Sequence, residues 1–175
     1  MTVVPDPGVL LNLVAGECAS KICKDLEVRF VVPEHCLCEE LLFEAPDKTR
    51  AAIEQCLARE QIEFDLLQGG LEHDYYMEFS TAASDGEAAS AAMAAARGWV
   101  FATDDRLLRR SFSRICAAET LTTAALFKRW EPSASDELGE AVRRLCKKAG
   151  FLCPPDDPDV ALWKTWHQPA LTLNN

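Results

Sequence analysis

The sequence predicts an α/β fold in which helices cover both faces of a mostly parallel sheet. Short apolar runs typical of buried strands recur along the chain, and next to each lies a stretch whose apolar residues have helical spacing. Strands that alternate with helices form parallel sheets, because each crossover helix returns the chain to the edge where the previous strand began. The carboxyl ends of such strands share one edge, where α/β proteins bind their ligands.

The first strand is predicted over residues 3–5, and a helix follows it. The next residues, DPG, are typical of a turn, and the run VLLNLV places most of its apolar side chains on one helical face. Asp6 therefore stands directly at the carboxyl end of a strand.

The second strand is predicted over residues 26–33, LEVRFVVP, a nearly continuous apolar run. Apolar residues at helical spacing then predict a helix over residues 34–44, which includes Glu40. A further amphipathic helix is expected over residues 48–58. The pattern of residues 61–67, QIEFDLL, fits a strand or a helix equally well.

Strong capping signals mark the middle of the chain. Ser84 and Glu87 have the spacing of a capping box, and the alanine-rich run that follows continues as a helix until Gly98. Residues 99–103, WVFAT, read as a buried strand. Arg106 begins another helical pattern, so two aspartates stand between this strand and the next helix.

The composition changes near residue 131, which divides the chain into a main domain over 1–130 and a helical extension over 131–175 packed on it. Residues 131–140, EPSASDELGE, are typical of a polar linker, and LGEAVRRLCKKAG fits a helix ending at a glycine. The irregular segment PPDDPD precedes a tail in which Trp163 and Trp166 are expected to pack on the domain or on a second subunit.

Length and composition predict one compact domain with a small appendage. The chain has 175 residues, of which 49% are hydrophobic, enough to bury a core without disulfides. Its eight cysteines show no CxxC pair and are expected to be reduced. No run of about 18 apolar residues occurs, and the first residues lack the basic region of a signal peptide. We therefore expect a soluble, cytoplasmic protein.

The excess of acidic over basic residues restricts which molecules the protein can bind. A net charge of −10, from 18 basic and 28 acidic residues, disfavours indiscriminate binding to nucleic acid and suits a multivalent cation or a basic protein. A nucleic-acid ligand would need a local basic strip. Four arginines recur at three- and four-residue spacing and can therefore share a helix face next to the acids, which would form such a basic strip: Arg106, Arg109, Arg110 and Arg114. The alternative is a solvated helix face whose arginines pair with surplus acidic residues.

The chain gathers carboxylates at the joints between strands and helices. If the strand over 3–5 and the strand over 99–103 lie side by side, these acids face one crevice. Clustered carboxylates repel one another, so a cation stabilises them, and an oxygen-only ligand set suits Mg²⁺ or Mn²⁺. The candidate metal ligands are Asp6, Glu40, Glu87, Asp104 and Asp105.

Each acid also has a purely structural interpretation. Glu87 could serve only the capping box, and one of Asp104 and Asp105 could cap the helix that begins at Arg106. Asp6 could be the first residue of a turn, and Glu40 could be a solvated helix residue. The three histidines lack ligand spacing, and no HExxH, nucleophile elbow, P-loop or GxGxxG motif is present.

Four segments, in this order and spacing, resemble the PIN domain family of metal-dependent nucleases: VVPDPGVLLNLVAGE, VVPEHCLCEELL, DGEAASAAMAAARGWVFATDDRLLRR and AVRRLCKKAGFLC. The GEA…DDR form and the trailing KKAGF resemble a prokaryotic subgroup of toxin-like ribonucleases. The resemblance implies a three-layer α/β/α sandwich. The acids that match the family's motif are Asp6, Glu40 with Glu39 as a neighbouring candidate, Glu87, and Asp105 with Asp104 as a possible substitute.

The resemblance also implies a function. It implies an endoribonuclease that uses Mg²⁺ or Mn²⁺ to hydrolyse RNA phosphodiester bonds, leaving a 5′-phosphate and a 3′-hydroxyl, with an antitoxin protein as partner and often a homodimer. Gly8 departs from the pattern, because a serine or threonine is usual there; a degenerate, protein-binding PIN-like module is therefore the alternative. A phosphatase of haloacid-dehalogenase type would need Asp-x-Asp after the first strand, but position 8 is glycine.

Overall fold

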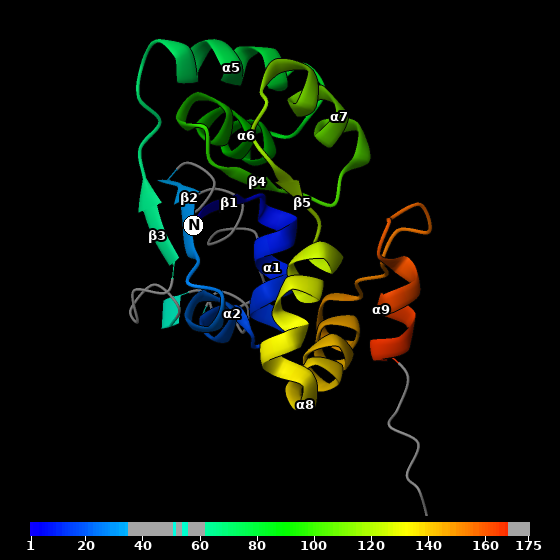
Figure 1. Cartoon of the computed structure of the whole chain (residues 1–175). Coiled ribbons are helices and arrows are strands. Elements are labelled where there is room, and N and C mark those ends of the chain that lie inside the picture. Colours follow the sequence, from blue (N-terminus) through cyan, green and yellow to red (C-terminus); the bar gives the residue numbers. More distant parts are fainter. Residues whose placement is uncertain (35–50, 52–53, 56–61, 168–175) are drawn as a thin grey trace, which may run out of the picture.

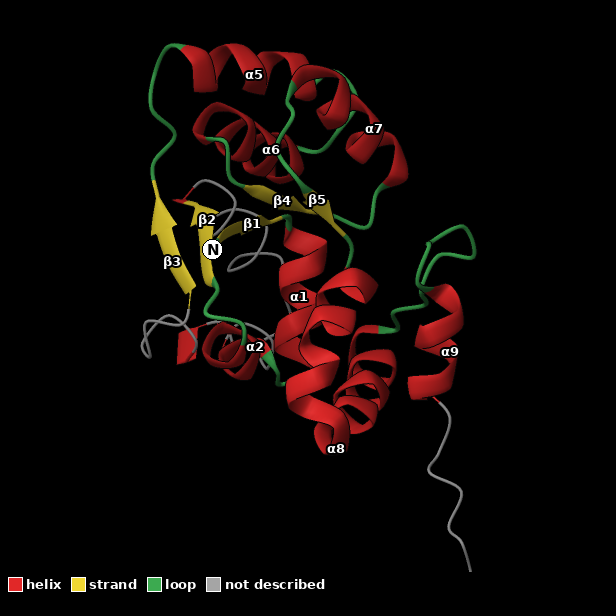
Figure 2. Cartoon of the chain, in the orientation of Figure 1, coloured by secondary structure: helices red, strands yellow, loops and turns green. Residues whose placement is uncertain are grey.

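The computed structural model describes residues 1–34, 51, 54, 55 and 62–167, and it has the predicted α/β fold (Figures 1 and 2). The described strands form a five-stranded sheet in the order β3-β2-β1-β4-β5, and each adjacent pair is parallel. The strands are β1 (Thr2–Pro5), β2 (Arg29–Pro33), β3 (Ile62–Asp65), β4 (Val100–Ala102) and β5 (Thr120–Leu121).

Helices cover both faces of the sheet and form a three-layer α/β/α sandwich, as Figure 2 shows. One face packs against α1 (Pro7–Ala15), α2 (Ala19–Asp25), α8 (Thr123–Ala149) and α9 (Val160–His167). The other face packs against α5 (Leu71–Phe79), α6 (Asp85–Arg97) and α7 (Arg106–Ile115). Within the described residues, no helix is both long enough and apolar enough to cross a membrane.

Alternation along the strands divides the core into two hydrophobic clusters. Val3 and Ala102 pack with the α1 and α8 side, whereas Val4 and Phe101 pack with the α6 side. All four side chains are fully buried. Because both faces are covered, the strands read as continuous apolar runs, which is the pattern that predicted them.

The register places the ends of β1 and β4 side by side, as the sequence predicted. Val4 pairs with Phe101 and Pro5 with Ala102, and the Asp6 amide donates a hydrogen bond to the Ala102 carbonyl at 2.8 Å. β2 lies on the other side of β1. The crossover direction therefore reverses between β1 and β4, and this switch point is where open α/β sheets bind ligands.

The capping signals of α6 are confirmed. The Ser84 side chain accepts from the Glu87 amide, the Glu87 side chain accepts from the Ser84 amide, and Gly98 ends the helix with φ at 65°. The ambiguous residues 61–67 contain strand β3. The expected helices over 34–44 and 48–58 lie almost entirely outside the described residues.

The sequence analysis did not assign α2, α5, β5 or α9. In α5, few side chains are buried, and no side chain caps its start at Gly70. The strand β5 has only two residues. Both elements therefore carry little hydrophobic periodicity, and packing against the rest of the fold decides their conformation.

The expected polar linker over 131–140 is wrong, because these residues belong to α8. Pro132 lies inside this helix, and the backbone leaves helical geometry at Ala134, with φ −131° and ψ 25°. Proline lacks the amide hydrogen that a helix interior needs and clashes with the preceding turn, and Pro132 lies next to the point where α8 divides into two helical segments at Ala134. The boundary expected between residues 130 and 131 falls within the first of these segments.

The last described helix, α9, contributes to the core through its tryptophans. The Trp163 ring contacts Phe127 and Phe151 edge-on, with centroids 5.5 and 5.1 Å apart. The Trp166 indole donates to the Glu131 carboxylate at 2.8 Å. Both tryptophans are buried, which confirms that the tail packs on the domain.

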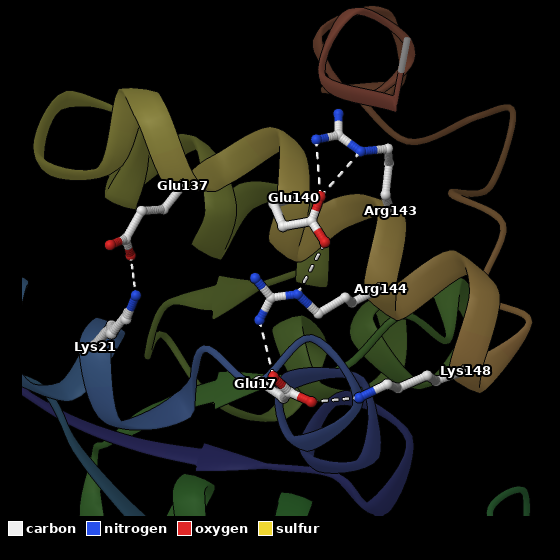
Figure 3. A network of polar contacts seen from close by, with 7 residues as sticks. All are labelled: Glu17, Lys21, Glu137, Glu140, Arg143, Arg144 and Lys148. Atoms are coloured by element: carbon white, nitrogen blue, oxygen red, sulfur yellow. Dashed lines mark hydrogen bonds and ion pairs between the residues drawn. The ribbon is translucent and has the colours of Figure 1, made fainter. Parts of the chain in front are cut away.

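Exposed ion pairs connect the corner between α1 and α2 to the second half of α8 (Figure 3). Glu17 accepts from Arg144 at 2.9 Å and also from Lys148, and Lys21 pairs with Glu137. Each exposed pair contributes about 0–1 kcal/mol, so the network orients α8 more than it stabilises the fold. The residues drawn are Glu17, Lys21, Glu137, Glu140, Arg143, Arg144 and Lys148.

We expect Trp163→Ala to lower the free energy of unfolding by about 3 to 5 kcal/mol, because it leaves a large cavity in the core. Leu152→Ala is the matched control, since Leu152 lies in the same region with 84% of its side chain exposed, and it should change little. Urea unfolding followed by far-ultraviolet circular dichroism measures both. Equal stability of the two variants would contradict the placement of α9 in the core.

Candidate functional site

Asp6 lies between β1 and α1 with its side chain buried. It is the N-cap of α1, with extended backbone (φ −70°, ψ 168°), and Oδ1 accepts from the Val9 amide at 2.6 Å. Pro7 occupies the first turn, where a missing amide hydrogen costs nothing. Only 3% of Asp6 is exposed. The turn expected at Asp6 is thus the N-cap of a helix, and the Asp6 carboxylate is buried in the protein.

Burial raises the pKa of Asp6 from 3.8 to about 7. Hydrogen bonds from the Thr103 hydroxyl and the Val9 amide act in the opposite direction, while the negative charges of Asp104 and Glu87 raise the pKa further. Two carboxylates from other parts of the chain, Asp104 and Glu87, therefore act on Asp6 at this edge of the sheet.

Asp104 follows β4 and turns inward. Its Oδ1 accepts from the Thr123 amide at 2.9 Å, and its Oδ2 accepts from the Thr123 hydroxyl at 2.6 Å and the Asn12 side chain at 3.2 Å. Burial is the main cause of a raised Asp104 pKa; hydrogen bonds from Thr123 and the charge of Arg109 oppose it, and the charge of Asp157 adds to it. Asp104 thereby joins the end of β4 to α1 and to the start of α8.

Asp105 has a different role from its neighbour. It is exposed and caps α7, accepting from the Leu108 amide at 2.8 Å, and its own amide donates to the Thr103 hydroxyl at 3.1 Å. The structural interpretation that one aspartate of the pair caps this helix is confirmed for Asp105. The structure places Asp104, rather than the favoured Asp105, in the buried acidic group.

Glu87 combines two roles that the sequence left as alternatives. The capping box is present, with the Ser84 amide donating to Glu87 Oε2 at 3.0 Å. At the same time the Glu87 charge raises the pKa of Asp6. Capping α6 therefore does not remove Glu87 from the acidic group. Glu40 and Glu39 lie outside the described residues.

Sequence reasoning missed the polar groups that orient the acids. Asn12 is a single polar residue inside the apolar run VLLNLV, only 7% exposed, and its amide contacts both Asp104 and the Thr123 hydroxyl. Thr103 is fully buried beside Asp6. A lone asparagine on an apolar helix face was the available signal, because buried polar groups need partners.

The departure at Gly8 affects the surroundings of Asp6. A Cβ atom built on Gly8 would lie 3.4 Å from Asp6 Oδ1, so a side chain at this position would contact the carboxylate. Here the hydroxyl that hydrogen-bonds Asp6 comes instead from Thr103. The usual serine or threonine would therefore supply a second hydroxyl to a carboxylate that already has one.

The donor chemistry suits a hard divalent cation. Mg²⁺ keeps several waters and is often held by one or two carboxylates, and the buried Asp6 and the partly buried Asp104 provide two with raised pKa values. In the described part of the chain, no group of three or more His, Cys, Asp or Glu side chains is arranged to hold a metal ion.

Some arginines of α7 fit the predicted basic strip for a ligand, and others fit the alternative of a face that pairs with the protein's own groups. Arg106 pairs with Asp156 at 2.8 Å, and Arg109 donates to the Thr103 carbonyl at 2.9 Å. Arg110 and Arg114 are exposed and form no ion pair with any described residue. Arg110 and Arg114, which lie one helical turn apart, are thus the part of the expected basic strip that could contact a ligand.

Surface hollows lie away from these acids. One of about 380 Å³ is lined by Leu67, Gln68, Gly69, His73 and Tyr76, next to α5 and the outer strand β3. Its lining is mostly uncharged, so it offers neither the carboxylates that hold a cation nor a positive group that would bind phosphate. We therefore build the candidate site on the acidic group instead.

Comparison with known proteins identified no relative of this chain. No protein-family model matches the chain, and no curated protein and no solved structure matches it either. The resemblance carried by the sequence motifs therefore stands without a matching relative, and the function has to be inferred from the residues and their geometry.

We expect Asp6→Asn to be more stable than the wild type at pH 8 without divalent ions, by up to about 4 kcal/mol. The native pKa of about 7 exceeds the unfolded value, so the native state binds more protons between pH 4 and 7 and the wild type loses stability as the pH rises through this window. Asparagine keeps the cap acceptor without the charge.

Urea unfolding at pH 4.5 and pH 8, with Asp105→Asn as a cap control, measures this effect. The advantage of Asp6→Asn should shrink or vanish at pH 4.5, where the wild-type carboxyl is protonated. An advantage of the same size at both pH values would contradict a buried, ionisable Asp6.

Proposed function

We propose that this chain is a PIN-like ribonuclease that hydrolyses RNA phosphodiester bonds with Mg²⁺ or Mn²⁺. The observation that carries the proposal is the convergence of Asp6, Asp104 and Glu87 at the carboxyl ends of the neighbouring strands β1 and β4. This edge is the ligand-binding edge of an open parallel sheet. A buried and a partly buried carboxylate that repel each other in an acidic protein favour a cation as the neutralising charge.

In this proposal Asp6 and Asp104 hold the ion, and Glu87 adds negative charge beside it. Asn12 and Thr123 orient Asp104, and Thr103 orients Asp6. A bound Mg²⁺ or Mn²⁺ supplies a water of lowered pKa and stabilises charge that develops on the phosphate. Glu40 remains a proposed fourth acid.

The choice of RNA and of the products comes from the motif resemblance. Arg110 and Arg114 support a phosphate-bearing substrate, because they are exposed cations without an ion pair to any described residue, on the helix that begins next to the acids. A 5′-phosphate product, a toxin-like role, an antitoxin partner, a homodimer and a cytoplasmic location all belong to the same proposal.

A protein-binding module without catalysis is the second candidate. Both oxygens of Asp104 already accept hydrogen bonds, from Thr123 and Asn12, so this carboxylate has a complete structural role as an anchor for α8. Gly8 leaves Asp6 without the hydroxyl that the motif usually provides. These two observations favour a protein in which Asp104 is a structural anchor rather than a metal ligand.

We expect Asp6→Asn and Asp104→Asn each to reduce Mn²⁺-dependent cleavage of a labelled single-stranded RNA by at least about 100-fold. Replacing groups that only support a metal ligand typically costs 10- to 100-fold, and a ligand itself should cost no less. Asp105→Asn should retain most activity, because asparagine caps a helix as well as aspartate does.

Circular dichroism of each variant is the control for folding. Loss of activity in Asp105→Asn but not in Asp104→Asn would reverse the assignment of the two aspartates. A folded wild type that cleaves no RNA, and whose melting temperature is the same with and without Mn²⁺ or Mg²⁺, would favour the protein-binding module.

A further inference from the structure

The segment after α8 returns to the acidic site and crosses the starts of two helices. Asp156 Oδ2 pairs with Arg106, the first residue of α7, at 2.8 Å. Asp159 Oδ1 pairs with Lys128 in the second turn of α8, at 2.7 Å. Asp104 immediately precedes α7's cap and contacts the first residue of α8, so the two ion pairs flank it.

Asp157 lies between these two anchored residues and is turned into the protein. Only 3% of it is exposed. Its Oδ1 accepts from the Asp159 amide at 2.8 Å, whereas its Oδ2 is buried and has no hydrogen-bond partner among the described residues. A buried carboxylate oxygen without a donor is costly unless a positive charge neutralises it.

Asp157 and Asp104 share one environment. The charge of Asp157 acts on Asp104, and both charges act on the neighbouring Cys153 thiol. Burial raises the pKa of that thiol to about 12, and the charges of Asp157 and Asp104 add to the effect. Of the nearby cations, Arg106 and Lys128 pair with Asp156 and Asp159, whereas the charge of Arg109 acts on Asp104 in the opposite direction to that of Asp157.

We propose that Asp157 is a further carboxylate of the cation site and binds Mg²⁺ or Mn²⁺ together with Asp104, directly or through the ion's water molecules. This inference rests on the proposed function of the acidic site. It assigns a chemical task to the C-terminal segment, which neither the sequence motifs nor the resemblance included in the site. Hard cations take carboxylate oxygens and retain water, so the buried Asp157 and the partly buried Asp104 are sufficient.

A structural role alone makes a different prediction. If Asp157 serves only to accept from the Asp159 amide, asparagine at this position keeps that acceptor and leaves ion binding unchanged. If it binds the cation, asparagine removes the charge and weakens binding. Asp156→Asn is the matched control, because Asp156 is the adjacent, exposed residue of the same segment.

We expect Asp157→Asn to weaken Mn²⁺ binding at least tenfold, measured by isothermal titration of the full chain, with Asp156→Asn within about twofold of the wild type. Hydrogen exchange of the wild type gives a second readout that does not depend on any variant. Saturating Mn²⁺ should slow amide exchange in residues 153–160.

Equal binding in Asp157→Asn and the wild type, with loss of binding in Asp6→Asn or Asp104→Asn, would overturn the role of Asp157 and leave the proposed nuclease site standing. Unchanged exchange over 153–160 in the ion-bound wild type would overturn it as well, even if Asp157→Asn failed to fold. A wild type that binds no Mn²⁺ would overturn this inference and the proposed function together.

Discussion

The arrangement of the acidic edge depends on the hydrogen bonds that the Asp104 carboxylate accepts. Through Thr123 and Asn12 it joins the end of β4 to the first turn of α8 and to α1. A carboxylate at a helix N-terminus is stabilised by the amide groups and by the helix dipole. This anchoring offsets part of the cost of partly burying a charge, so Asp104 can remain next to Asp6, and within the described residues no lysine or arginine forms an ion pair with it.

Local signals allowed the sequence to predict part of this structure. The limits of α6 follow from Ser84, Glu87 and Gly98, whose capping roles depend only on residues within the same helix. The parallel sheet follows from apolar runs that are buried on both faces. The choice between Asp104 and Asp105 could not be made this way, because it depends on Thr123, which lies 19 residues away in sequence.

The bent helix α8 shows where composition misleads. Residues 131–140 contain proline, serine, aspartate and glycine, which usually indicate a linker. Nevertheless Ala134 and Leu138 are buried, and burial continues through Ala141 and Leu145 on the same face. Tertiary packing of these residues stabilises helical segments on both sides of Ala134, where the helical geometry is interrupted next to Pro132. Only the three-dimensional context supplies that packing.

The packing of α9 has a consequence for the order in which the protein assembles during synthesis. Trp163 completes the aromatic contacts of Phe127 and Phe151, so this part of the core closes only after residue 163 has left the ribosome. The strands that carry Asp6 and Asp104 emerge much earlier. Until then a nascent chain would lack this part of the core, and any activity that requires the closed fold would begin only after residue 163 has emerged.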